Sequence, residues 1–206
     1  MATTYFTRGR STKARGRKQL RFLLLDLPSD HEIDSGLATE CTTIAALLHN
    51  RGLGTRLKHF RISTLESFSN LPYYTYDPKF IHLSCHASKD GVGVLGGVMS
   101  WKDFAKELKS ILAPLADNSH RRVLTLSCCQ SKSAAKHLTQ ELSGYITGIY
   151  YFSSEDLPFS ESVTAWCMYY LNKDLDKPHA AIKDRINKFF EADVMLFTNL
   201  TQNNDS

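Results

Sequence analysis

Two short stretches of this chain carry side chains that could do covalent chemistry. The first, FIHLSCHASKDGVGVLGG at residues 80–97, holds two histidines, a cysteine and a G-x-G-x-x-G spacing. The second, TLSCCQS at residues 125–131, holds two adjacent cysteines. A thiol beside a histidine permits nucleophilic catalysis, because the histidine can take and return the proton. Metal binding and dinucleotide binding are the competing interpretations.

The glycine spacing does not favour a dinucleotide site. A dinucleotide fingerprint places its glycines in the turn directly between a strand and a helix, where the helix N-terminus meets the pyrophosphate. Here the preceding strand is predicted to end near Cys85, and the next helix to begin near Ser100. Gly91, Gly93 and Gly96 therefore favour a small hairpin, which needs glycine for its turn.

The metal interpretation requires ligands from both stretches. The available side chains are those of His82, Cys85, His86, Cys128 and Cys129. Successive side chains of a strand point to opposite faces, so His82 and His86 share one face while Cys85 points to the other. The first stretch is thus not a chelate by itself, although four ligands could come from both stretches together.

Nucleophilic catalysis requires the fewest assumptions. If the two stretches are adjacent parallel strands, their ends bring a cysteine and a histidine together. Cys41, Cys85 and Cys167 lie on apolar faces and are interpreted as small core residues.

The elements that would position these residues alternate along the chain. Buried strands are predicted at about 20–27, 80–85, 122–127 and 145–152, because these runs are mainly apolar and of strand length, and a further strand is proposed at about 55–62. Helices are predicted from apolar spacings of 3 and 4 at about 37–48, 100–111, 133–142, 159–170 and 182–189. The last dozen residues are predicted to be a polar tail. This alternation predicts a three-layer α/β/α domain with a mainly parallel sheet, which gathers reactive groups at the carboxyl ends of its strands.

Length and composition favour one soluble domain. The chain has 206 residues, of which 42% are hydrophobic and 22% charged. No apolar run approaches the ~18 residues of a membrane span, and the run at 20–27 contains Arg21 and Asp26, unlike a signal peptide. Five cysteines scattered through apolar segments suit free thiols in a reducing compartment, so a cytoplasmic location is expected.

Basic charge is concentrated at the N-terminus. Seven of the 25 Lys and Arg residues, and none of the 21 acids, lie in the first 25 residues, although the whole chain carries only +4. We therefore expect a basic flexible arm at 1–19, a domain at 20–197 and a polar tail at 198–206. The arm is interpreted as a solvated tail, a contact to nucleic acid or a membrane surface, a targeting segment or a removable leader.

The two stretches resemble the catalytic blocks of CHAT-type peptidases, which are caspase-like cysteine peptidases. The resemblance rests on IHLSCHAS at 81–88 followed by Asp90-Gly91, and on VLTLSCCQS at 123–131. The family pattern is a strand ending in His-Gly, an Asp-Gly turn, and a later strand ending in Leu-Ser-x-Cys-x-Ser. The aromatic helix at 159–171 and the Ala-Ile helix at 180–186 extend the resemblance over about 80–187.

This resemblance implies a caspase-like fold and a Cys/His dyad without a metal or other cofactor. His86 would be the general base and Cys129 the nucleophile, 43 residues later. The backbone N–H groups of Ala87 and Cys129 would bind the oxyanion, although the family has glycine at the position of Ala87. Cys128 occupies the variable position before the nucleophile and is expected to face the other way.

Substrate specificity is predicted from acids in the loops after two strands. These are Asp26 and Asp30 on one side, and Glu155 and Asp156 on the other. An acidic pocket would favour cleavage after Arg or Lys, and the Arg-rich arm would then be a substrate itself. The alternative is that these are ordinary solvated loop acids.

A second class of function remains open at this stage. A caspase-like module without turnover could serve as a binding or scaffold protein, with the basic arm contacting nucleic acid. Because both His86 and Cys129 are present, the enzyme is the favoured hypothesis. Single-domain relatives in the resembled group imply a protein substrate and an activating or regulatory partner, often in defence or programmed cell death, and no membrane partner.

Overall fold

The computed structural model describes residues 20–28, 39–71, 76–115, 121–155, 158–173 and 178–200. Its centre is a six-stranded sheet in the order β2-β1-β3-β6-β7-β8. The strands are β1 (Phe22–Leu27), β2 (Leu57–Arg61), β3 (Phe80–Cys85), β6 (Val123–Ser127), β7 (Gly148–Phe152) and β8 (Met195–Asn199). All neighbours are parallel except β8, which runs antiparallel to β7.

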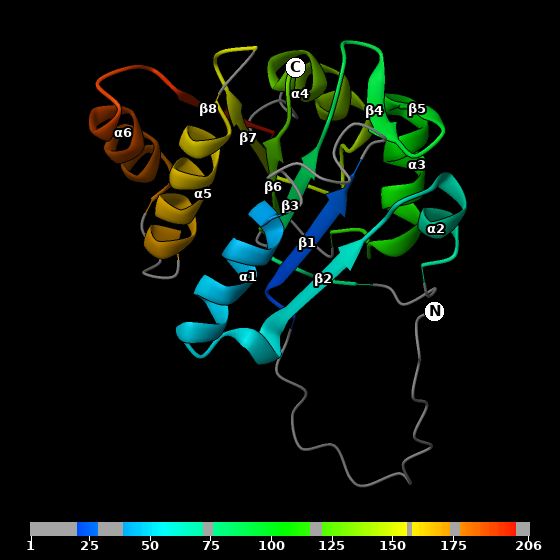
Figure 1. The fold of residues 1–206 in the computed structure, drawn as a ribbon, viewed down its shortest axis with the longest axis horizontal. Helices are drawn as coiled ribbons and strands as arrows, with labels where there is room; N and C mark the ends of the chain where they lie inside the picture. The colour runs from blue at the N-terminus through cyan, green and yellow to red at the C-terminus, as the bar shows by residue number, and fades with distance from the viewer. Residues whose placement is uncertain are drawn as a thin grey trace, which may run out of the picture.

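Helices cover both faces of this sheet, as Figure 1 shows. The helices are α1 (Glu40–Asn50), α2 (Leu65–Ser69), α3 (Trp101–Ile111), α4 (Ser131–Glu141), α5 (Phe159–Lys173) and α6 (His179–Phe189). A short 3-10 turn, η2 (Gly54–Arg56), precedes β2. Helices α1, α5 and α6 pack on one face, and α3 and α4 on the other. The protein is thus an α/β structure with a mainly parallel central sheet, compatible with a three-layer sandwich.

The central strands are buried on both faces, which explains their continuous apolar sequences. In β1, Leu23, Leu25 and Leu27 pack toward the face of α3 and α4, while Phe22 and Leu24 pack toward α1 and α5. Helix α3 begins as predicted, because the Ser100 hydroxyl accepts a hydrogen bond from the Asp103 N–H.

The glycine-rich segment forms the predicted hairpin. Strands β4 (Gly91–Val94) and β5 (Gly97–Ser100) pair antiparallel as a separate two-stranded sheet beside α3. Gly96, in the turn between them, has a φ of 82°, a backbone conformation that residues other than glycine rarely adopt.

Two elements differ from the sequence-based expectation. Met195–Asn199 was expected to belong mostly to a tail, but it forms β8. Its sequence is short and mixes polar with apolar residues, so the strand depends on its backbone hydrogen bonds to β7. Helix α2 was not predicted, and it begins where the Thr64 side chain caps the N–H of Ser67. Within the described residues, no helix combines the length and apolar character that crossing a membrane requires.

Candidate active site

The strand register brings the ends of β3 and β6 level with each other. The two strands are parallel neighbours, and every paired residue differs by 43 in number, up to Ser84 opposite Ser127. His86 and Cys129 differ by the same 43 and lie two residues past this last pair. Adjacent strands lie only ~4.8 Å apart, so the register brings the strand ends that lead into His86 and Cys129 level with each other. Figure 1 shows β3 and β6 side by side there.

The β4–β5 hairpin holds the backbone after β3. The Gly93 N–H donates to the His86 carbonyl at 2.8 Å, and the Ser88 N–H donates to the Gly91 carbonyl at 2.9 Å. The indole N–H of Trp101 donates to the Ser88 carbonyl at 3.2 Å. The hairpin therefore fixes the segment that carries His86, and this is the structural use of the glycine pattern.

This pairing leaves the Ala87 N–H directed away from the hairpin. Ala87 faces Val92 across an antiparallel bridge whose two hydrogen bonds come from the neighbours His86 and Ser88. In such a non-hydrogen-bonded pair, the N–H groups point away from the partner strand. Ala87 does not have a positive φ, so this backbone conformation suits alanine as well as glycine.

Cys129 lies in a tight turn between β6 and α4. The next residue, Gln130, adopts the left-handed conformation with φ 57°, and α4 begins directly after it at Ser131. The Ser131 hydroxyl donates to the Phe152 carbonyl at 3.2 Å and accepts from the Phe152 N–H at 3.0 Å. The turn is therefore anchored to the end of β7, with Cys129 before the N-terminus of a helix, where negative charge is favoured.

The other cysteines are less suited to act as the nucleophile. Cys128 packs against the hydrophobic cluster under α3 and α4. Cys41 and Cys85 are buried. Burial and the charges of Glu40 and Asp26 raise the pKa of the Cys41 thiol well above its ordinary value, and burial and Glu40 raise that of Cys167.

A buried polar network lies one layer below this edge of the sheet. Glu40, the first residue of α1, is fully buried and accepts hydrogen bonds from Ser127 and Ser162, both at 2.9 Å. Its other oxygen lies 3.0 Å from Nε2 of His82, and Nδ1 of His82 lies 2.8 Å from the Thr125 hydroxyl. His82 is thus a strand histidine packed inside the fold, and the role of Glu40 was not foreseen from the sequence.

Glu40 is held as a carboxylate by these contacts. Burial alone would raise its pKa, but the hydrogen bond and charge of His82 and the hydroxyls of Ser127 and Ser162 lower it overall. Its charge in turn contributes to the raised pKa of the Tyr170 hydroxyl, for which burial is the main cause. A single anion therefore influences groups on β3, β6, α1 and α5.

The predicted specificity acids have different environments. Asp26 lies inside β1 rather than in the loop after it, is almost completely buried, and has Arg61 at 3.9 Å. Glu155 is exposed after β7, accepts a hydrogen bond from the Gln130 side chain at 3.0 Å and, through its carbonyl, one from the Gln130 N–H at 3.0 Å. Glu155 therefore contacts the residue next to Cys129, whereas Asp30 and Asp156 lie outside the described residues.

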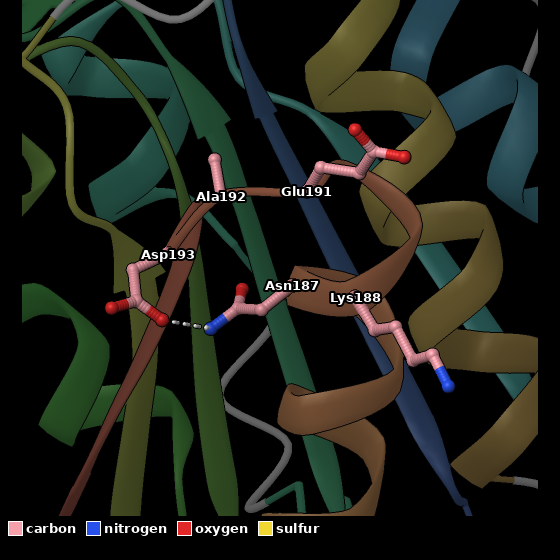
Figure 2. A pocket seen from close by; sticks show the side chains of 5 residues that line it. All are labelled: Asn187, Lys188, Glu191, Ala192 and Asp193. Carbon is pink, nitrogen blue, oxygen red and sulfur yellow. Dashed lines mark hydrogen bonds between the residues drawn. The ribbon is translucent and has the colours of Figure 1, made fainter.

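Metal-ligating side chains and a surface pocket are two further features that bear on ligand binding. Within the described ranges, no three His, Cys, Asp or Glu side chains are grouped as metal ligands. An open pocket at the end of α6 is lined by Asn187, Lys188, Glu191, Ala192 and Asp193 (Figure 2). Its Asn187 side chain donates to Asp193 and to the backbone of Met195, so it anchors β8. None of its lining residues belongs to the β3 or β6 ends.

Comparison with protein-family models and with curated protein sequences finds no match for this chain.

Proposed function

We propose that this protein is a caspase-like cysteine endopeptidase of the CHAT type, with Cys129 as nucleophile and His86 as general base. The observation that supports the proposal is the register of β3 and β6, which brings the strand ends leading into these two residues level with each other at the carboxyl edge of the sheet. The anchored turn before α4 and the hairpin-held loop after β3 support it, because both residues lie on fixed backbone.

The proposed reaction has two stages. The Cys129 thiolate attacks the carbonyl carbon of a peptide bond, and the N–H groups of Ala87 and Cys129 bind the resulting oxyanion. The C–N bond then breaks as protonated His86 gives its proton to the leaving amine, which leaves a thioester on Cys129. Water, deprotonated by His86, attacks the thioester, and the carboxylic acid product and the thiol are released.

Cleavage after a basic residue is part of the proposal. Glu155 supports it, since its carboxylate is exposed and hydrogen bonded to Gln130, the residue that follows the nucleophile. A negative charge in this position would attract an Arg or Lys side chain of the substrate. In keeping with the resembled family, we further propose that activity is controlled by a partner or signal, as in a defence or cell-death effector in the cytoplasm.

Labelling with electrophilic peptide probes tests the proposal. One probe carries Arg next to the warhead and the other Asp, and adducts are measured by intact mass on the wild type, Cys129→Ala, His86→Ala and the matched control Cys128→Ala. We expect an adduct on the wild type and on Cys128→Ala, none on Cys129→Ala, and labelling slowed about a hundredfold or more in His86→Ala. The Arg probe should react faster than the Asp probe.

Other outcomes would count against parts of the proposal. An adduct that persists in Cys129→Ala and disappears in Cys128→Ala would show that the nucleophile is Cys128 and not Cys129. A faster Asp probe would refute the basic specificity while leaving the dyad intact. No adduct on any variant would leave either a protease that is inactive without its partner or signal, or the binding or scaffold module. Salt-sensitive nucleic-acid affinity that disappears with residues 1–19 is the diagnostic of the module.

A further inference from the structure

The Glu40 network connects the two strands that carry the proposed dyad. Its donors are Ser127, two residues before Cys129, and His82, four residues before His86. Side chains at even spacings along a strand share one face, so His82 and Ser127 are the network members that stand on the strand ends leading into His86 and Cys129. A third donor, Ser162, brings in α5, and its hydroxyl lies 2.8 Å from that of Ser127.

The network is closed on every side. Both Glu40 and His82 have no exposed side-chain surface. The His82 ring is held edge-on between Trp166 and Tyr170, with ring centroids 5.4 and 5.6 Å away. Because the Glu40 carboxylate can only accept, His82 presents a protonated Nε2 to it, which determines the orientation of the imidazole.

A network of this kind tolerates the loss of a member poorly. Removal of one partner leaves a buried polar group or charge without compensation, so the surrounding elements must shift to let water in. Those elements are α1, β3, β6 and α5, and two of them end at the dyad positions. A displacement of about 1 Å between reacting groups is enough to reduce catalysis strongly.

We infer that Glu40 is a positioning residue for the dyad, which holds the ends of β3 and β6 in the relative position that lets His86 and Cys129 act together. It works through His82 on one strand and Ser127 on the other, and does not touch the substrate. This inference rests on the proposed function. It predicts that weakening the network uncouples Cys129 from His86 even when the protein remains folded.

The test measures how fast iodoacetamide alkylates Cys129 in the full chain, by peptide mass, at pH 6.5 and at pH 10. An isolated cysteine is only about 1% thiolate at pH 6.5, so fast alkylation there reports its pairing with a histidine. We expect Glu40→Gln and Ser162→Ala to react about tenfold more slowly than the wild type at pH 6.5. At pH 10, where any accessible thiol is ionised, the rates should coincide. Ser162→Thr, which keeps the hydroxyl, should restore the rate.

The matched control is Thr147→Ala, at the opposite end of the sheet. The Thr147 hydroxyl donates to the Arg122 carbonyl at 3.0 Å and accepts from the Arg122 N–H at 3.1 Å, so its loss also destabilises a buried polar pair. It should lower the melting temperature without changing the alkylation rate at pH 6.5. If Glu40→Gln does not fold, Ser162→Ala and its Thr counterpart carry the test, because they leave the Glu40–His82 pair in place.

The failures of the inference and of the proposed function can be told apart. A fast wild type with unchanged network variants, or with an equally slow Thr147→Ala, overturns the positioning role and leaves the dyad standing. A wild type that reacts at pH 6.5 no faster than His86→Ala overturns the dyad, and the positioning role with it.

Discussion

At the scale of single residues, the glycine spacing that resembles a dinucleotide fingerprint serves packing instead. A Cβ on Gly91 would lie 2.1 Å from the backbone oxygen of Met99 on the partner strand, so only glycine allows β4 to pair here. At Gly96 there is open space, and the constraint is its φ of 82°. The two glycines of one motif are therefore required for different reasons.

These two constraints predict different costs. Gly91→Ala must push β4 away from β5, which should lower the free energy of unfolding by about 2 kcal/mol. Gly96→Ala meets no atom and should cost only about 1 kcal/mol, from its left-handed backbone. Urea denaturation of the two variants checks this difference. Equal costs would mean that the hairpin relaxes around the added methyl group.

At the scale of elements, the Glu40 carboxylate joins α1 to β3, β6 and α5. The apolar spacing of α1 places Cys41, Ile44 and Leu48 toward the core, and all three are buried. Its first residue adds a polar contact to three other elements, and a buried anion with three donors depends on all of them together.

This contact predicts a specific pH dependence of stability. The folded protein keeps Glu40 ionised to a lower pH than the unfolded chain, whose Glu40 has an ordinary pKa of 4.5. The stabilisation is therefore complete above about pH 4.5 and declines as the pH falls through the lowered folded value. At neutral pH, Glu40→Gln should cost about 3 kcal/mol, and this difference from the wild type should shrink in acid.

Chemical denaturation of both proteins between pH 3 and pH 7 measures that difference. Burial and the charges of His82 and Arg61 also lower the pKa of His59, so the stability of both proteins should fall in acid for that reason too. A difference that stays constant from pH 7 to pH 3 would show that Glu40 acts through shape and not through charge.

At the scale of the whole molecule, the two ends of the sheet have different roles. The carboxyl ends carry the candidate site, whereas the amino ends are joined by the fully buried guanidinium of Arg122. Arg122 donates to the carbonyls of Pro78, Ala113 and Tyr145 and to the carboxylate of Asp77 at 2.6 Å. One side chain thus supplies hydrogen-bond donors to the carbonyls of three segments that lie outside regular strand pairing.

Loss of this cation should affect the whole fold. Arg122→Ala leaves three carbonyls without their donor, so it should lower the free energy of unfolding by about 3 to 5 kcal/mol, a large part of the stability of an ordinary domain. Asp77→Asn keeps an acceptor at a partly exposed position and should cost about 1 kcal/mol. Thermal unfolding followed by circular dichroism compares the two. A small effect of Arg122→Ala would show that water replaces the guanidinium.

The sequence by itself determined the elements whose signals are local. Strand β3 runs from Phe80 to Cys85 as predicted, because most of its side chains are apolar and its length is that of a buried strand. The hairpin and the Ser100 cap were likewise predictable, since turn glycines and cap hydroxyls act over a few residues. The alternation of these elements was enough to predict an α/β protein with a mainly parallel sheet.

Only the tertiary structure decided the strand order, the burial of Glu40 and the existence of β8. Each depends on partners far away in the chain: Ser127 and Ser162 bind Glu40 from 87 and 122 residues away. Asp26, expected to face a substrate from a loop, lies inside β1 near Arg61 of the neighbouring strand. Composition and periodicity do not encode such pairings, because the cost of burying a charge depends on which donors the fold brings to it.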